Sequence, residues 1–262
     1  MELLKTENLS KNFLRSNKKI EAVKNINFSL EKGKTYGLVG ESGCGKSTLA
    51  SMLCLLTKPD SGKIFFKSKD IHTLSKKETK DFHKKVQIIF QNPYDSLNPK
   101  MKIKNIIEEG LIIHKITKSK EEKDYLVNEM RTMCALDNSV LEKYPSELSG
   151  GQRQRVSLAA SMILQPELLI LDEAVSSLDV LVQAQILNIL KLMQKSFGTT
   201  YLFISHNLHV ISYLSDKIGV MYNGSIIEEG KAEDILSNPE QEYTKKLFES
   251  SYTIKSSAST IF

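Results

Sequence analysis

The chain has 262 residues, of which 40% are hydrophobic and 26% charged, and its formal net charge is +5. This ordinary globular mixture can bury a sizeable core and allows one large domain or a core with a subdomain. The mild positive excess suits a phosphate ligand, an anionic membrane surface or nucleic acid, and it is equally typical of a lysine-rich soluble surface. Charge alone therefore assigns no partner.

The cysteines and the hydrophobic runs argue against a disulfide-linked, secreted or membrane-spanning protein. Three cysteines without a CxxC pair predict a reduced intracellular protein with neither a disulfide framework nor a structural zinc site. The first ten residues have an acid at position 2 and no apolar core, so we expect no signal peptide. No run approaches the roughly 18 apolar residues that cross a bilayer, so docking at a membrane would need a partner.

The first part of the chain is predicted to be mostly β. Residues 25–30 alternate along a strand with one apolar face, formed by Ile26, Phe28 and Leu30. Residues 34–40 form a short apolar strand that runs into glycines, and residues 61–71 form another strand region. Between them, residues 46–56 have the spacing of a helix, with apolar positions at Leu49, Met52, Leu53 and Leu56.

From about residue 93 to 149 the pattern becomes helical and highly charged, which predicts an inserted helical subdomain after a strand at 86–90. Alternation of strands and helices then returns. We expect a helix from about Gly151 towards Leu164, then elements over 167–173 (strand), 180–194 (helix), 199–207 (strand) and 218–230 (hairpin). Asn223-Gly224 supplies the positive φ values of the hairpin turn. This alternation favours a parallel α/β sheet, and residues 250–262 are expected to be loosely ordered.

A glycine-rich loop between the strand at 34–40 and the helix from 46 fits the pattern G-x-x-x-x-G-K-[ST], in the strand–loop–helix context that a phosphate-binding loop requires. Its glycines let backbone N–H groups surround phosphates, and the helix start adds a positive dipole end. Lys46 would reach the β and γ phosphates and Ser47 would bind Mg²⁺. A chance glycine loop is disfavoured by this context. The nucleotide-binding residues of the loop are Gly40, Glu41, Ser42, Gly43, Cys44, Gly45, Lys46, Ser47 and Thr48.

Two acidic residues follow the apolar strand at 167–173. Asp172 is expected at the carboxyl end of that strand, where ligands lie in such sheets, and would hold Mg²⁺. Glu173 is the candidate general base for water attack on the γ phosphate, a role that contributes about 10²–10⁴-fold in rate. The alternative is an acidic pair that caps the next helix, and its position after a buried strand makes that interpretation weaker.

The segment "LSGGQRQRV" (148–156) predicts a second anion-binding helix start. Ser149 would be the N-cap, and Gly150 and Gly151 would expose helix N–H groups below it. We expect the buried face of this helix at Val156, Ala159, Ala160 and Ile163. The segment resembles the signature of ATP-binding cassette ATPases, and the glycine loop, "LLILDE", "SSLD" and "FISHN" stand in that family's order and spacing.

The resemblance covers nearly the whole chain and implies an α/β fold with a P-loop NTPase (RecA-like) core and an antiparallel β subdomain. The core would cover 1–92 and 150–240, the helical subdomain 93–149 and a partly disordered tail 241–262. In this family each ATP lies between the glycine loop of one copy and the signature of another. A single chain would therefore be inactive and would work in a two-cassette sandwich.

Individual roles follow from the resemblance. Phe13 would stack on adenine, although a core phenylalanine is about as well supported. Gln91 would sense Mg²⁺ and the attacking water, and His206 would touch the γ phosphate. Ser149 and Gly151 would contact the γ phosphate held by the other copy, within the nucleotide-binding segment of Ser149, Gly150, Gly151 and Gln152, and a loop between the two copies would contain Ser177, Leu178 and Asp179.

The loop "QNPYDSLNP" (91–99) resembles the dipeptide, oligopeptide and nickel branch of importers. In such transporters, this loop and the helical subdomain bind transmembrane permease subunits, so we expect a peripheral protein on the cytoplasmic face of the inner membrane. An extracytoplasmic binding protein would deliver the cargo. Ala174 replaces a proline that is common in the family, which slightly favours a nickel or metal-chelate cargo. The chain resembles the shorter of two ATPases, so we expect a second cassette ATPase in a heterodimer, with a homodimer as the alternative.

Other classes of cassette ATPase fit this sequence less well. Cassette ATPases of DNA repair insert long coiled coils, whereas this insert is short and has no sustained heptads. Translation-factor relatives carry two cassettes in a chain, and one is present here. An exporter cassette is disfavoured by the loop at 91–99. We therefore expect ATP and Mg²⁺ as ligands and no nucleic acid.

Overall fold

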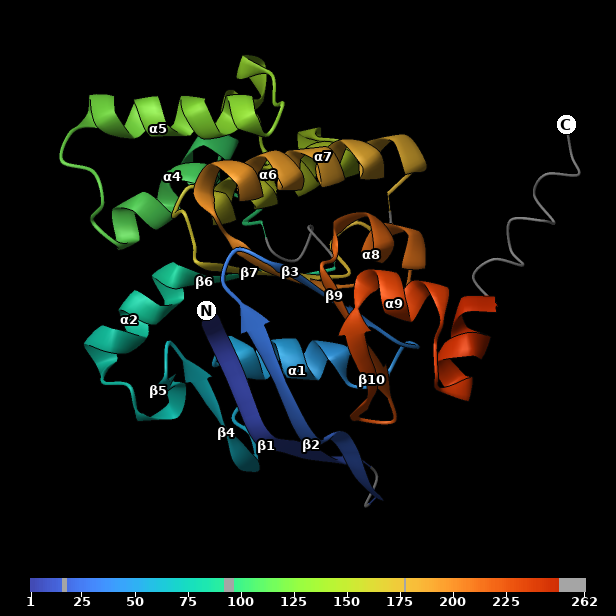
Figure 1. Cartoon of the computed structure of the whole chain (residues 1–262). Coiled ribbons are helices and arrows are strands. Elements are labelled where there is room, and N and C mark those ends of the chain that lie inside the picture. Colours follow the sequence, from blue (N-terminus) through green and yellow to red (C-terminus); the bar gives the residue numbers. More distant parts are fainter. Residues whose placement is uncertain (16–17, 92–96, 177, 250–262) are drawn as a thin grey trace, which may run out of the picture. The chain divides into compact units, whose positions relative to one another are not determined.

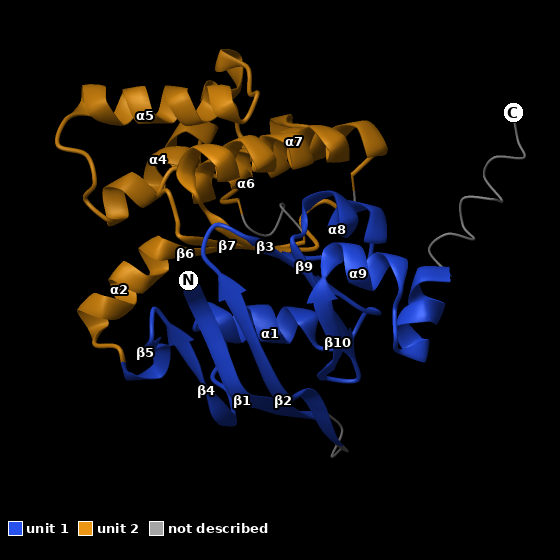
Figure 2. Cartoon of the chain, in the orientation of Figure 1, with its two compact units in different colours: residues 1–73, 202–262 blue, residues 74–201 orange. Residues whose placement is uncertain are grey.

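The structure is a computed structural model that describes residues 1–15, 18–91, 97–176 and 178–249. Contacts divide the chain into two compact units, Met1–Thr73 with Leu202–Phe262 and Leu74–Tyr201 (Figure 2). This division differs from the predicted one into 1–92 with 150–240, 93–149 and 241–262, which stays a prediction. In the described part of the chain, no helix is both long and apolar enough to span a membrane.

The first unit contains an antiparallel sheet with the strand order β2-β1-β4-β5 (Figure 1). Its strands are β1 (Glu2–Arg15), β2 (Lys18–Glu31), β4 (Ser61–Phe66) and β5 (Lys69–Asp70). β1 pairs antiparallel with both β2 and β4. The predicted apolar face of β2 is confirmed, because Ile26, Phe28 and Leu30 are all buried. A short 3-10 helix, η1 (Ile71–Thr73), follows β5.

A second group of strands in this unit includes β3 (Thr35–Val39), after which the glycine loop begins, and the hairpin of β9 (Lys217–Tyr222) and β10 (Ser225–Lys231), whose turn contacts the loop. In strand order, β10 is next to β9, then β3, then β8 (Thr200–Ile204), whose first residues belong to the other unit. β3 and β9 are parallel, and β9 and β10 form the predicted hairpin. Its turn has positive φ at Asn223 and Gly224, as the sequence predicts.

The helices of the first unit are α1 (Lys46–Leu53), α8 (Leu208–Leu214) and α9 (Ala232–Ser237), and residues 242–249 are also helical. The helix predicted over residues 46–56 is shorter than its apolar spacing indicates. The helix ends at Leu53, Leu55 has a positive φ of 60°, and Leu56 is 57% exposed. The turn after the helix directs the chain back towards β4 before residue 56 can pack. The loosely ordered stretch predicted at 250–262 lies outside the described residues.

The second unit is mostly helical and contains the parallel pair β6 (Val86–Ile89) and β7 (Leu168–Asp172). Its α-helices are α2 (Lys76–Lys85), α4 (Ile103–Ile113), α5 (Lys120–Met133), α6 (Gly150–Met162) and α7 (Val180–Phe197). Two 3-10 helices, η2 (Asn138–Glu142) and η3 (Pro145–Glu147), precede α6. The predicted helical character of the insert is confirmed for its described residues, 97–149.

Helix α6 differs from the prediction of a single buried face. Ala160 is only partly buried, whereas Arg153, Gln154 and Leu158 are buried on other sides. The reason is that α4, α7 and β6 all contact this helix. Arg153 is accommodated because its guanidinium Nη1 donates to the Pro145 carbonyl at 3.0 Å.

Candidate functional site

The glycine loop connects β3 to α1 in the first unit. At two of its positions, no residue other than glycine fits. Gly45 is the N-cap of α1 with φ of 112°, and a Cβ there would lie 2.0 Å from the Ala22 carbonyl oxygen. Gly40 has φ of 154°, and its Cβ would lie 2.2 Å from the Met221 carbonyl oxygen. Both positions combine an unusual φ with a backbone neighbour, so only glycine fits the loop.

Lys46 is 3% exposed, and its ammonium group binds the loop itself. The Nζ atom donates to the Gly40 carbonyl at 2.7 Å and to the Glu41 carbonyl at 2.8 Å. It also lies 3.7 Å from the Cys44 Sγ, and burial raises the pKa of that thiol. Charge-assisted hydrogen bonds thus hold the ammonium group within the loop. Around it, Glu41, Ser42, Gly43 and Ser47 are exposed, and Thr48 is half-buried.

Sequence reasoning missed two groups that contact the outside of this loop. The Gly224 N–H of the β9–β10 turn donates to the Cys44 carbonyl at 3.0 Å. The Tyr243 hydroxyl accepts a hydrogen bond from the Glu41 N–H at 3.2 Å. No local pattern identifies these groups, because each lies about 180 to 200 residues from its partner in the sequence.

In the second unit the two predicted acidic residues lie as expected at the carboxyl end of β7. Asp172 is 5% exposed and is the last residue of the strand. Glu173 follows with a positive φ of 50°, which is uncommon for residues other than glycine and asparagine and ends the extended conformation of the strand. Gln91 lies after β6, and its Nε2 donates to the Glu173 Oε2 at 3.2 Å. The structure therefore brings together the predicted base and the predicted glutamine.

The helix start at Ser149 has the predicted cap. The Ser149 hydroxyl accepts from the Gln152 N–H at 3.3 Å, and the Gln152 Oε1 accepts from the Ser149 N–H at 3.0 Å, which together form a capping box. Gly151 packs against α7, where a Cβ would lie 2.5 Å from the Val182 Cγ1. Helix α7 has its own cap, because the Asp179 carboxylate accepts from the Val182 N–H at 3.0 Å. Ser177 lies outside the described residues.

The two remaining predicted residues are on the surface of the first unit. Phe13 on β1 is 43% exposed, which excludes the alternative of a core phenylalanine, and the Lys11 Nζ lies 5.5 Å from its ring centroid. His206 follows β8 and is exposed. Both residues are accessible to a ligand. Among the described residues, no group of three or more histidine, cysteine, aspartate or glutamate side chains could hold a metal ion.

The sequence matches the profile of a known family, described as ABC transporter, over residues 23–176. The oligopeptide transport ATP-binding protein OppF of Bacillus subtilis is 43% identical over 247 residues, which are 94% of this chain and 81% of that protein. The dipeptide transport ATP-binding protein DppF of Haemophilus influenzae is 44% identical over 229 residues, which are 87% of this chain and 69% of that protein.

Solved structures agree with this match. A dimeric ATP-binding cassette, MJ0796, in a post-hydrolysis state bound to ADP and Pi, aligns with a TM-score of 0.80 and 26% identity over 88% of this chain and 99% of that one. The cbiO1 protein of Clostridium perfringens, part of an ABC transporter complex, aligns with a TM-score of 0.80 and 28% identity over 90% of this chain and 91% of that one. The predicted fold class is thereby confirmed. The chain belongs to the ABC transporter family and is an ATP-binding cassette ATPase.

Proposed function

We propose that the chain is the ATP-hydrolysing subunit of a peptide importer and that Glu173 is its general base. The observation that supports hydrolysis most directly is the hydrogen bond between Gln91 and Glu173 in a chain that also carries a glycine loop with a buried lysine. The assignment to peptides rests on relatives named as oligopeptide and dipeptide transport ATP-binding proteins. Nickel or a metal chelate, which the sequence at Ala174 slightly favours, is the second cargo to test.

Different residues bind the nucleotide, activate the attacking water and contact the adenine. The loop amides and Lys46 bind the β and γ phosphates of ATP, and Lys46 exchanges its contacts with loop carbonyls for phosphate oxygens. Glu173 accepts a proton from the attacking water, while the Gln91 amide fixes the orientation of the carboxylate. Phe13 stacks on the adenine, and His206 contacts the γ phosphate.

The three oxygen donors that we assign to Mg²⁺ are of the chemical kind that it prefers. The Ser47 hydroxyl, the Gln91 amide oxygen and the Asp172 carboxylate are hard ligands, and Mg²⁺ commonly binds one or two carboxylates together with phosphate oxygens and water. The single buried carboxylate of Asp172 at the end of β7 is consistent with such a site. When bound, Mg²⁺ would neutralise charge that develops on the phosphate oxygens.

The signature segment of one chain acts on the ATP held by another cassette. The Ser149 capping box leaves the first N–H groups of α6 directed out of the helix start, with Gly150, Gly151 and Gln152 in the same segment. Asp179 and the residues before it form the loop between the two cassettes. The second cassette is a different ATPase in a heterodimer, with a homodimer as the alternative.

The partners of the sandwich are transmembrane permease subunits, and an extracytoplasmic binding protein delivers the cargo. The chain then sits peripherally on the cytoplasmic face of the inner membrane. ATP binding closes the sandwich, hydrolysis opens it, and the permease alternates its access. No nucleic acid takes part.

Purification of the chain with its partners tests this proposal. The Glu173→Gln variant carrying an affinity tag is isolated from detergent-solubilised membranes with Mg-ATP, and the co-purified proteins are identified by mass spectrometry. We expect two polytopic membrane proteins and a second cassette ATPase, after which uptake of labelled di- and oligopeptides is compared with uptake of nickel chelates. Ribosomes or DNA-processing proteins without a membrane partner would contradict import, and export of the labelled compounds without uptake would favour an exporter.

A further inference from the structure

The segment after α9 reaches back to the glycine loop. Residues 242–249 are helical, and Tyr243 near their start places its hydroxyl 3.2 Å from the backbone nitrogen of Glu41, whose N–H it accepts. Glu41 is the second residue of the loop and is exposed, whereas Tyr243 is half-buried. Burial raises the pKa of Tyr243 above its ordinary value, so the hydroxyl is neutral throughout the physiological pH range.

The position of Tyr243 is fixed by its own surroundings. Its ring lies against Tyr222 at the end of β9, with a centroid distance of 4.2 Å and an interplanar angle of 39°. On the same helical segment, Thr244 and Phe248 are 0% and 4% exposed. The segment is therefore packed within the first unit, and Tyr243 contacts Glu41 from a fixed position.

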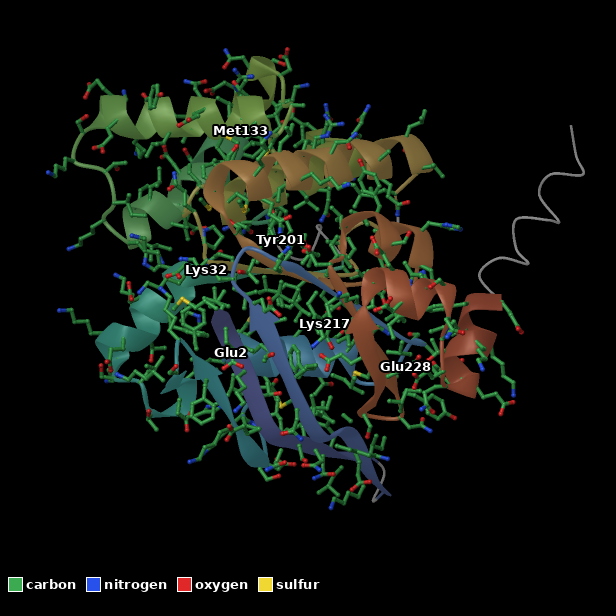
Figure 3. The ribbon with its side chains drawn as sticks, in the orientation of Figure 1. Glu2, Lys32, Met133, Tyr201, Lys217 and Glu228 are labelled. Atoms are coloured by element: carbon green, nitrogen blue, oxygen red, sulfur yellow. The ribbon has the colours of Figure 1, made fainter. Side chains whose placement is uncertain are left out.

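A carboxylate on β10 anchors the start of this segment. Glu228, labelled in Figure 3, accepts hydrogen bonds from the backbone N–H groups of Glu240 at 2.7 Å and Gln241 at 3.1 Å. A charged acceptor next to the beginning of a helical segment also interacts favourably with the helix dipole. The segment that carries Tyr243 is thus anchored before the tyrosine by Glu228 and after it by the buried side chains of Thr244 and Phe248.

The hairpin that carries Tyr222 supplies a second bond to the same loop. Its Gly224 N–H donates to the Cys44 carbonyl, so the loop is held at residues 41 and 44 by two adjacent parts of the first unit. Within the loop, the Cys44 N–H donates to the Glu41 carbonyl at 3.3 Å, which connects the two points. A displacement of Glu41 is therefore transmitted to Cys44 and to the carbonyl that Lys46 contacts.

We infer that Tyr243 is a positioning residue for ATP binding: its hydroxyl holds Glu41 so that the loop is already arranged for the triphosphate before ATP arrives. This inference rests on the proposed nucleotide site at the loop. A pre-arranged loop loses less conformational freedom when the ligand binds, and the affinity is correspondingly higher. The effect belongs to binding and leaves the chemical step at Glu173 unchanged.

The test removes only the hydroxyl, in Tyr243→Phe, and measures four quantities on the chain assembled with its partner cassette. Loss of one neutral hydrogen bond predicts a rise of about two- to tenfold in the Kd for a fluorescent ATP analogue and in the KM for ATP. The kcat should stay within twofold, and amide hydrogen exchange in the peptide around Glu41 should be faster without nucleotide. Tyr222→Phe is the matched control, because it removes a hydroxyl from the other ring and leaves the bond to Glu41 in place.

The possible outcomes distinguish the role of Tyr243 from the existence of the nucleotide site. An unchanged Kd and unchanged exchange in Tyr243→Phe, with Lys46→Ala abolishing ATP binding, would overturn the role of Tyr243 and keep the nucleotide site. If Lys46→Ala also bound ATP normally, the site itself would be wrong. Equal losses in Tyr243→Phe and Tyr222→Phe would assign the effect to the ring pair and overturn the positioning role of the hydroxyl. Amide hydrogen exchange measured across the whole chain also detects poor folding of Tyr243→Phe. If exchange becomes faster to the same extent in all peptides, and not mainly around Glu41, the positioning role is rejected.

Discussion

Replacing Gly151 with alanine separates helix propensity from packing at the signature helix. Propensity alone predicts that alanine stabilises a helix by about 1 kcal/mol relative to glycine. The structure predicts the opposite, because the new Cβ would lie 2.5 Å from the Val182 Cγ1. Val182 is β-branched and cannot easily rotate away from the contact. We therefore expect Gly151→Ala to lower the free energy of unfolding by about 1–3 kcal/mol, the usual cost of overpacking.

The neighbouring glycine provides the matched control. A Cβ at Gly150 would meet only the Leu178 Cδ2 at 3.8 Å, an ordinary contact, so Gly150→Ala should be neutral or slightly stabilising. The midpoint of thermal unfolding for Gly151→Ala should fall by about 2–12 °C, given roughly 2–4 °C per kcal/mol in chains of this size.

A double-mutant cycle with Val182→Ala tests whether the contact with Val182 is the cause. The two substitutions together should cost less than the sum of their separate effects, because Val182→Ala removes the methyl group that the new Cβ meets. A Gly151→Ala variant that is as stable as Gly150→Ala, or a cycle in which the two effects add, would show that the close contact with Val182 has no cost.

Three other substitutions or reagents test the loop and the core. Lys46→Ala removes charge-assisted hydrogen bonds and should weaken ATP binding by about 10-fold or more in a fluorescence titration, whereas an unchanged affinity would contradict the phosphate site. Gly45→Ala should lower the thermal midpoint much more than Gly43→Ala, since only the Gly45 Cβ meets a backbone atom, the Ala22 carbonyl oxygen at 2.0 Å, and equal losses would contradict the clash. Burial raises the pKa of Cys134 to about 12, so iodoacetamide at pH 8 should leave it unmodified in the folded chain and modify it in urea, as mass spectrometry would report.

The elements that the sequence predicts well are those with a local cause. The hairpin follows from Asn223-Gly224, whose positive φ values are present, and the capping box follows from Ser149 and Gln152 three residues apart. The glycine loop is recognised because its chemistry lies within nine consecutive residues. In each case the residues that determine the geometry are close in the sequence.

The predictions that failed or stayed open depend on the tertiary environment. The burial of α6 on several sides comes from its contacts with α4, α5, α7 and β6, which the apolar spacing of α6 itself does not show. Phe13 has the same apolar pattern whether it packs in a core or stands on the surface, and only its 43% exposure excludes the core. The hydrogen bond between Tyr243 and Glu41 joins residues about 200 positions apart, so no local pattern could have revealed it.

The measurement that tests the central claim most directly is single-turnover hydrolysis by Glu173→Gln assembled with its partner cassette, with the complex in excess over labelled ATP and with Mg²⁺ present. The Gln side chain keeps the shape of Glu173 and its contact with Gln91 but cannot accept a proton from water. We predict that ATP binding is retained, that hydrolysis slows by about 10²–10⁴-fold and that the nucleotide recovered from the protein is ATP. Hydrolysis within a few-fold of the wild-type rate would show that Glu173 is not the base.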